Sequence, residues 1–177
     1  MKTAKEYLES IEKLKLRVYL NGERIDSIVK NPVTKTVVDA TAKIYDLAQN
    51  PVYQDVMTAY SPLVQERVNR SVHLFRSRDD LEKRVEMAIL TSRLLGTCNY
   101  RCPACDILNG LASTTYEMDK KLGTKYHERL INYVKWVQKN DLAVSGSATD
   151  VKGDRGKDLK NKTSICTLGL SRKGMTV

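Results

Sequence analysis

Residues 77–105 read SRDDLEKRVEMAILTSRLLGTCNYRCPAC, and this stretch joins a helix-forming segment to a cluster of cysteines. The acidic residues that follow Ser77 are typical of the first turn of a helix. Apolar residues recur at helical spacing and predict an apolar face made of Leu81, Val85, Ala88 and Ile89. Gly96 is expected to end this helix. The sequence therefore predicts a long amphipathic helix that stops just before the first cysteine.

Two elements are predicted near the start of the chain. Thr3 and Glu6 have the spacing of a capping box, and apolar residues follow at helical spacing, so a helix is expected there. The dipeptide Asn21-Gly22 separates residues 17–20 from residues 23–25 and suits the two-residue type I′ turn of a β-hairpin.

Three more helices are predicted. The first starts at Pro32 and ends before Asn50-Pro51, with an apolar stripe at Val33, Val37, Ala40, Ile44 and Leu47. The second runs from about Cys105 to Met118. The third runs from about Tyr126 to Lys139 and carries the apolar residues Leu130, Ile131, Val134, Trp136 and Val137.

The character of the sequence changes after Asn140. Residues 142–157, LAVSGSATDVKGDRGK, contain few helix formers and many Gly, Ser, Asp and Thr residues, which predicts a strand that runs into a polar loop. The expected fold class is mainly α with one small β-hairpin. A domain boundary is expected near residue 141, with a helical domain over residues 1–140 and the start of a β domain over residues 141–156.

Composition narrows the possible partners. The 177 residues carry a net charge of +9, but the basic residues are scattered and the aromatic residues are not interleaved with them. Nucleic-acid binding is therefore not expected. No stretch approaches the roughly 18 apolar residues of a membrane helix, and no secretion signal is evident. We expect a cytoplasmic protein without a membrane partner.

Cysteines cluster in CNYRCPAC, residues 98–105, which contains three of the four cysteines of the chain. Without a secretion signal, such clustering favours a metal or redox site over a disulfide framework. On one helix, the Cβ atoms of Cys98 and Cys102 would lie roughly 5–6 Å apart on the same face. Pro103 leaves two arrangements open: a helix that breaks at Cys102, or a site that straddles a loop and the start of the next helix.

Two other interpretations of these cysteines stay open. They could serve as small buried hydrophobic residues. The spacing Cys98-x3-Cys102-x2-Cys105 is also the one with which radical S-adenosylmethionine enzymes hold a [4Fe-4S] cluster. Those enzymes place the motif after the first strand of a parallel βα barrel, whereas an amphipathic helix precedes it here.

Five separated segments resemble the 4-hydroxyphenylacetate 3-hydroxylase family. They are TAKEYLESIEKLKLRVYLNGERID (3–26), YDLAQNPVYQDVMTAYS (45–61), SRDDLEKRVEM (77–87), STTYEMDKKLGTKYH (113–127) and TDVKGDRG (149–156). Their order and spacing also fit the family. The pair Cys98-x3-Cys102 before the STTYE run is similar to that of the 4-hydroxybutyryl-CoA dehydratases of this family, whereas the flavin-dependent aromatic hydroxylases lack such a pair.

The resemblance implies the N-terminal helical domain of an acyl-CoA dehydrogenase-like fold, followed by the start of a truncated β domain. It implies an enzyme that uses FAD and a [4Fe-4S] cluster to dehydrate 4-hydroxybutyryl-CoA to crotonyl-CoA by radical chemistry, and that isomerises vinylacetyl-CoA. The implied partners are an acyl-CoA substrate and further copies of the chain, since the intact relatives are homotetramers. This chain alone is expected to be inactive. The alternatives are a flavin-dependent aromatic hydroxylase and a non-catalytic fragment.

The resemblance also implies site residues. Cys98 and Cys102 are expected to be two of four cluster ligands, together with a cysteine and a histidine beyond residue 177, and Cys105 has no counterpart among them. The flavin site is expected to be lined by Thr149, Asp150, Lys152, Gly153, Asp154 and Arg155. His127 is a candidate catalytic residue, because in related hydroxylases a histidine in this neighbourhood helps to hold the substrate.

The resemblance stops abruptly after Gly156, and residues 157–177 are expected to be out of frame and poorly ordered. Codons permitted for residues 162–177, KTSICTLGLSRKGMTV, yield D-V-D-L-Y-V-R-V-V-E-K-R-D-D-G when they are read from the third base of each codon. This peptide is similar to the continuation of the family. In this reading, the junction of Met175 and Thr176 must encode Asp.

Overall fold

The computed structural model describes residues 1–96 and 101–144, and for Cys102 and Pro103 it describes the backbone alone. Contacts divide the chain into one compact unit, residues 1–145, and a second, residues 146–177, which lies outside the described residues. The elements, in chain order, are α1 (Ala4–Lys13), β1 (Val18–Leu20), β2 (Glu23–Ile25), α2 (Pro32–Gln49), α3 (Gln54–Met57), β3 (Thr58–Ser61), β4 (Glu66–Asn69), the 3-10 turn η1 (Arg70–Val72), α4 (Arg78–Leu95), α5 (Cys102–Leu122) and α6 (Tyr126–Lys139).

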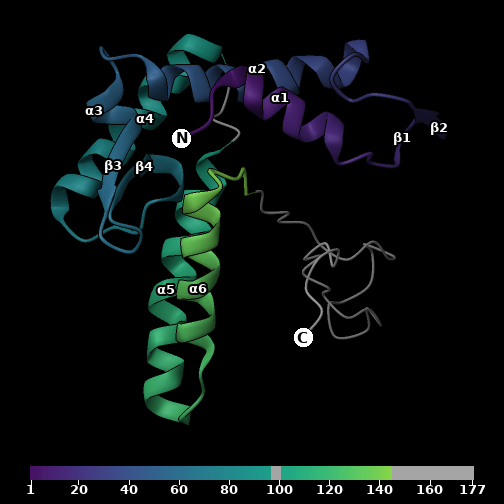
Figure 1. The fold of residues 1–177 in the computed structure, drawn as a ribbon. Helices are drawn as coiled ribbons and strands as arrows, with labels where there is room; N and C mark the ends of the chain where they lie inside the picture. Colours follow the sequence, from purple (N-terminus) through teal and green to yellow (C-terminus); the bar gives the residue numbers. More distant parts are fainter. Residues whose placement is uncertain (97–100, 145–177) are drawn as a thin grey trace, which may run out of the picture. The chain divides into compact units, whose positions relative to one another are not determined.

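The described residues are mostly helical, as predicted (Figure 1). A strand was predicted after Asn140. Its described residues, 142–144, are not in a strand, and the rest of the predicted strand lies outside the described residues. The rest of the predicted β-domain segment, residues 145–156, and the predicted out-of-frame tail, residues 157–177, lie outside the described residues.

A helix cap, a hairpin turn and a helix end were predicted from local sequence, and the structure contains all three. The capping box of α1 is present, because Glu6 N–H donates to the Thr3 hydroxyl and Thr3 N–H donates to the Glu6 carboxylate. Asn21 and Gly22 adopt φ angles of 52° and 87° between the antiparallel strands β1 and β2, as a type I′ turn requires. Gly96 ends α4 in the left-handed region, with φ 67°. These predictions are confirmed.

A second antiparallel hairpin, formed by β3 and β4, was not predicted. Its strands have four residues each, and its connection PLVQ (62–65) has no Asn-Gly signal. Gln65 instead takes the left-handed conformation, with φ 58°, and its side-chain amide donates to the Pro62 carbonyl at 2.8 Å. A turn that uses glutamine at positive φ is invisible to a search for glycine and asparagine.

Three buried clusters form the core of the described residues. The first joins α1 to α2 through Tyr7, Val38, Ala42 and Tyr45. The second joins α2, α3 and α4 through Ile44, Leu47, Ala48, Met57 and Met87. The third joins η1, α5 and α6 through Val72, Leu108, Val134 and Val137.

The predicted apolar faces of α2 and α4 are only partly the packing faces. In α2, Ile44 and Leu47 are buried, but Val33 and Val37 are 63% and 45% exposed. In α4, the predicted face is wrong, because Leu81, Val85 and Ile89 are about half exposed and Ala88 is half-buried. Met87 and Thr91 are buried instead, and the Thr91 hydroxyl donates to the Met87 carbonyl at 2.7 Å. The side on which α2 and α3 lie decides the buried face, and helical periodicity does not contain that information.

The helix predicted from Cys105 to Met118 is longer than expected and spans Cys102–Leu122. Pro103 occupies its first turn, where a missing N–H costs little. The last predicted helix agrees with α6 at both ends, although Trp136 is 53% exposed and lies outside the core.

Candidate functional site

Helices α5 and α6 pack side by side as a hairpin (Figure 1). Gly123 ends α5 with a φ of 65°. Asp119, in the last turns of α5, caps α6: its carboxylate accepts the N–H groups of Tyr126 and His127, both at 2.9 Å. The Thr124 hydroxyl also donates to it, at 2.6 Å. Desolvation raises the pKa of Asp119, but these hydrogen bonds outweigh it and lower the pKa overall.

His127, the candidate catalytic residue, lies against α5 in the first turn of α6. Its Nδ1 is 3.2 Å from Thr115 Oγ1, and its ring meets the Tyr116 ring edge-on with centroids 5.6 Å apart. The Thr115 hydroxyl donates to the Leu111 carbonyl at 2.7 Å, so we assign it as the acceptor of Nδ1–H from His127. The lone pair of the neutral ring then lies on Nε2, the nitrogen available to a substrate or a proton.

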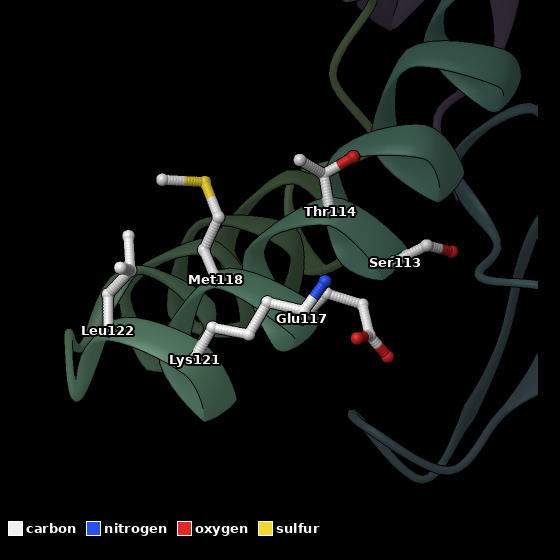
Figure 2. A pocket seen from close by; sticks show the side chains of 6 residues that line it. All are labelled: Ser113, Thr114, Glu117, Met118, Lys121 and Leu122. Carbon is white, nitrogen blue, oxygen red and sulfur yellow. The ribbon is translucent and has the colours of Figure 1, made fainter.

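A shallow pocket of about 470 Å³ lies along one face of α5 (Figure 2). Its lining residues are Ser113, Thr114, Glu117, Met118, Lys121 and Leu122. All six come from α5, and Figure 2 shows their side chains along a single helix. The pocket is therefore a helix face and not an enclosed cavity, and it identifies no ligand by itself.

The predicted cluster ligands fall at the beginning of α5. Cys102 is its first residue and Arg101 is its N-cap, so Cys98 precedes the helix. Cys98 itself and the side chain of Cys102 lie outside the described residues, and the ligand pair stays a prediction.

Cys105 lies one turn further along α5 and is wholly buried. Its Sγ is 3.8 Å from the Arg70 carbonyl oxygen, and its neighbours Ala104 and Leu108 are buried too. A thiol in this setting behaves as a small hydrophobic residue with a weak donor. Among the side chains that the structure describes, no group of three or more His, Cys, Asp or Glu residues could hold a metal ion.

Arg101 is fully buried and joins three parts of the fold. Its Nη2 donates to Asp141 Oδ1 at 2.8 Å and to the Leu142 carbonyl at 3.1 Å. Its guanidinium carbon lies 4.1 Å from the centroid of the Tyr45 ring, a cation–π contact. The Tyr45 hydroxyl donates to the Asp141 carbonyl at 3.0 Å, and Lys2 N–H donates to Asp141 Oδ2 at 3.0 Å. Burial raises the pKa of Tyr45, so its hydroxyl stays a donor.

Asp141 occupies a backbone position that glycine usually fills. It follows the C-cap of α6 with φ 42°, and its N–H donates to the Gln138 carbonyl at 3.2 Å. Leu142 N–H donates to the Val137 carbonyl at 3.1 Å, which completes a Schellman motif. The left-handed conformation costs an L-residue about 1–2 kcal/mol, although aspartate tolerates it better than most.

A second buried arginine, Arg70, lies in η1. Its Nε donates to the Val56 carbonyl at 2.7 Å, and its Nη2 donates to the carbonyls of Asp55 and Thr58 at 2.9 and 2.6 Å. These carbonyls lie at the C-terminal end of α3, where helical partners are missing. Burial lowers the pKa of Arg70, and nearby carboxylates, above all Asp80, oppose that shift.

His73 and Asp80 complete the centre around Arg70. His73 Nε2 lies 3.2 Å from Asp80 Oδ1, and Arg70 Nη1 lies 3.4 Å from the same oxygen. Burial lowers the pKa of His73, so at neutral pH the contact is a hydrogen bond from a neutral ring. Desolvation raises the pKa of Asp80, but hydrogen bonds from Arg76 and Ser77, together with the charge that His73 carries once it is protonated in acid, lower it overall.

These buried polar groups were not predicted from the sequence. Arg101 stands inside the cysteine run and Asp141 stands where a helix-ending glycine is common, and both signals were present in the sequence. The predicted flavin residues, Thr149, Asp150, Lys152, Gly153, Asp154 and Arg155, lie outside the described residues. Over the described ranges, no helix is long and apolar enough to cross a membrane.

Comparison with known proteins identifies the family of this chain. Residues 3–172 match the family described as 4-hydroxyphenylacetate 3-hydroxylase, N-terminal. The chain belongs to this family, which confirms the predicted resemblance.

Two curated relatives represent two branches of the family. The 4-hydroxybutyryl-CoA dehydratase/vinylacetyl-CoA-Δ-isomerase of Clostridium aminobutyricum is 45% identical over 154 residues, which cover 87% of this chain and 31% of the relative. The oxygenase component of 4-hydroxyphenylacetate 3-monooxygenase from Thermus thermophilus is 25% identical over 157 residues, 88% of this chain and 31% of the relative. The chain thus spans about a third of the length of these relatives.

Solved structures give the same two branches. An oxygen-tolerant archaeal 4-hydroxybutyryl-CoA dehydratase from N. maritimus matches with a TM-score of 0.85 and 36% identity, over 92% of this chain and 32% of that one. The oxygenase component of a 4-hydroxyphenylacetate 3-monooxygenase matches with a TM-score of 0.68 and 22% identity, over 90% and 33%, and shows the fold alone. A related structure of that oxygenase is a complex with FAD.

Proposed function

We propose that this chain is the N-terminal part of a 4-hydroxybutyryl-CoA dehydratase that also isomerises vinylacetyl-CoA and that uses FAD and a [4Fe-4S] cluster. The observation that carries the proposal is the sequence pair Cys98-x3-Cys102, of which Cys102 is the first residue of α5. It occurs in a chain that is 45% identical to such a dehydratase and 25% identical to a monooxygenase. The proposed substrate is an acyl-CoA, and the proposed assembly is a homo-oligomer.

The residues around the pair fit a cluster. Cysteine thiolates are the donors that iron–sulfur clusters take. The backbone of Cys102 begins a helix, and the amino end of a helix favours an anion. Arg101, directly before it, is held from several sides, so the backbone that carries the proposed ligand is anchored.

The proposed reaction converts 4-hydroxybutyryl-CoA into crotonyl-CoA and water, with no net oxidation. When bound, the flavin would exchange one electron with the substrate and the cluster would act as a Lewis acid on the departing hydroxyl. The residues of the chain would bind and orient these groups. Lys152 and Arg155 offer positive charge to a phosphate, and Gly153 permits close approach of the backbone. His127 Nε2 can accept a hydrogen bond or a proton from the substrate.

Cysteine substitutions test this proposal. In the full-length protein purified without oxygen, Cys98→Ser and Cys102→Ser should each remove most of the iron and acid-labile sulfide, because each removes a proposed ligand. We expect dehydration of 4-hydroxybutyryl-CoA to fall by at least about 100-fold, since even the loss of a supporting contact to a metal ligand costs about 10–100-fold. Cys105→Ser is the matched control, because Cys105 is buried against the Arg70 carbonyl. It should keep the iron content of the wild type.

The opposite pattern would contradict the dehydratase assignment. If Cys105→Ser abolishes the cluster while Cys98→Ser leaves it intact, the radical S-adenosylmethionine interpretation gains. A wild-type protein that lacks iron in anaerobic preparations also contradicts it. The isolated 177-residue chain should show no turnover, because two of the proposed ligands are expected outside it.

A flavin-dependent aromatic hydroxylase is the second candidate. The matches to monooxygenase components support it. It predicts a flavoprotein without iron, and the iron and sulfide analysis above separates it from the dehydratase. A fragment without catalytic function would show neither cofactor.

A further inference from the structure

We propose that Arg101 and Asp141 are positioning residues, whose buried ion pair fixes the start of α5, the helix that carries Cys102, to the turn that ends α6. The inference rests on the proposed function, because Cys102 is one of the proposed cluster ligands. Neither residue was singled out by the sequence analysis.

The pair joins two places in the chain that lie far apart in sequence. Arg101 lies between the two proposed ligands, three residues after Cys98 and one before Cys102. Asp141 lies 40 residues further along the chain, at the exit of α6. The contacts of Arg101 Nη2 with Asp141 Oδ1 at 2.8 Å and with the Leu142 carbonyl at 3.1 Å therefore connect the start of α5 to the end of α6.

The backbone of Asp141 adopts a conformation that favours glycine. Its φ of 42° and the two hydrogen bonds of the Schellman motif would suit glycine at lower cost. Aspartate adds a carboxylate whose two oxygens receive Arg101 and the N–H of Lys2. The contacts of the Asp141 carboxylate, and not the backbone requirement of the Schellman motif, therefore explain why aspartate occupies this position.

Aromatic side chains hold Arg101 in place. Its guanidinium lies over Tyr45, and Tyr45 stacks on Tyr7 with centroids 4.6 Å apart. The Tyr45 hydroxyl binds the Asp141 carbonyl, so α2 contacts both partners of the pair. A buried ion pair adds little stability compared with apolar packing of the same volume, whereas it specifies one geometry. The Arg101–Asp141 pair is therefore suited to hold the backbone of Cys102, at the start of α5, in one position.

Substitution of Asp141 tests the proposal, with iron as the readout. Asp141→Asn keeps the shape and the tolerance of positive φ but removes the charge that binds Arg101. Asp141→Gly removes the side chain and relieves the backbone. In the full-length protein purified without oxygen, both variants should contain less than half of the wild-type iron per chain and show altered visible absorption of the cluster. Their far-ultraviolet circular dichroism should match the wild type.

Asp119→Asn is the matched control. It removes a carboxylate from the opposite end of α6, where Asp119 caps the helix far along the chain from the pair. This variant should keep the wild-type iron content and absorption. Variants of Asp141 that keep both would overturn the positioning role, and so would the loss of helical signal in both variants, because the pair would then act on folding as a whole. A wild-type protein without iron would instead refute the proposed function itself.

Discussion

Two buried arginines, Arg70 and Arg101, are each paired with an aspartate, yet they differ in what they join. The guanidinium of Arg70 binds three carbonyls at the end of α3 and Asp80, and these partners lie within 15 residues of it. Arg101 binds Asp141 and Leu142, about 40 residues away, and lies on Tyr45 of α2. The first centre is local, and the second connects distant parts of the chain.

The difference indicates two tasks. Arg70 satisfies backbone carbonyls that a short helix leaves open, so its loss leaves several buried acceptors without donors. Arg101 joins the cysteine segment to the exit of α6. Without it, the start of α5 would no longer be fixed relative to the end of α6. Asp141 would still accept the N–H of Lys2. We therefore expect the Arg70 centre to govern stability and the Arg101 centre to govern cofactor binding.

The largest predicted effect on stability is that of Arg70→Met. The substitution removes three hydrogen bonds to carbonyls and leaves Asp80 without its arginine partner. The free energy of unfolding should fall by about 3–5 kcal/mol, as for other broken buried pairs. Urea unfolding followed by circular dichroism measures the loss.

Arg70→Lys is the matched control for charge. One ammonium group cannot reproduce the planar fork that reaches three carbonyls, so most of the loss should remain. If the lysine variant is as stable as the wild type, charge and not carbonyl binding explains Arg70. Arg70 and Arg101 would then no longer differ in that Arg70 acts by binding backbone carbonyls.

A smaller decrease in the free energy of unfolding is predicted at acidic pH. His73 faces Asp80, Arg70 and Arg76, and burial holds its pKa below 6.5. The unfolded chain therefore binds a proton that the folded chain does not, and the free energy of unfolding should fall as the pH drops from 6.5 through the folded pKa. The slope is at most about 1.4 kcal/mol per pH unit, the value for one proton. Unfolding measured at several pH values between 7 and the folded pKa tests it.

His73→Gln provides the comparison for this pH dependence. Glutamine can donate to Asp80 but does not titrate, so the decline just below pH 6.5 should disappear. A second decline, below about pH 4, should remain, because the pKa of Asp80 is lowered in the folded state and its protonation opposes folding. A glutamine variant with the same slope as the wild type near pH 6 would rule out His73 as its source.

The sequence predicted the parts of the fold that local signals determine. The capping box at Thr3, the Asn21-Gly22 turn and the ends of α6 depend on residues within one or two turns of each other. The family was also predictable, since matched segments are spread along the chain. Local hydrogen bonding and backbone preference suffice for such features.

Features that depend on distant residues escaped prediction. The face of α4 is turned so that Met87 is buried and Val85 is exposed, because α2 and α3 lie on that side. The turn of β3 and β4 uses Gln65 at positive φ. Arg101 and Asp141 are 40 residues apart, and only the packed structure shows that they meet. The cofactor ligands remain predictions, because Cys98 and residues 149–155 lie outside the described part of the chain.

The smallest effect is predicted for the ion pair between Lys83 and Asp55, which borders the Arg70 centre. Lys83 Nζ lies 2.7 Å from Asp55 Oδ1, and its hydrogen bond lowers the pKa of Asp55. The carboxylate is largely exposed, so water screens the pair, and Asp55→Asn should cost less than about 1 kcal/mol, with a smaller loss at high salt.

Asp55→Asn sharpens the comparison because Arg70 binds the backbone carbonyl of Asp55, at 2.9 Å, and not its carboxylate. Asparagine keeps that carbonyl in place. Urea unfolding at low and high salt should therefore separate a weak, salt-sensitive surface pair from the strong, salt-insensitive Arg70 centre beside it. A loss as large as that of Arg70→Met would show that the exposed carboxylate and the buried guanidinium act as one network, and stability in this region would then depend on surface charge as much as on backbone hydrogen bonds.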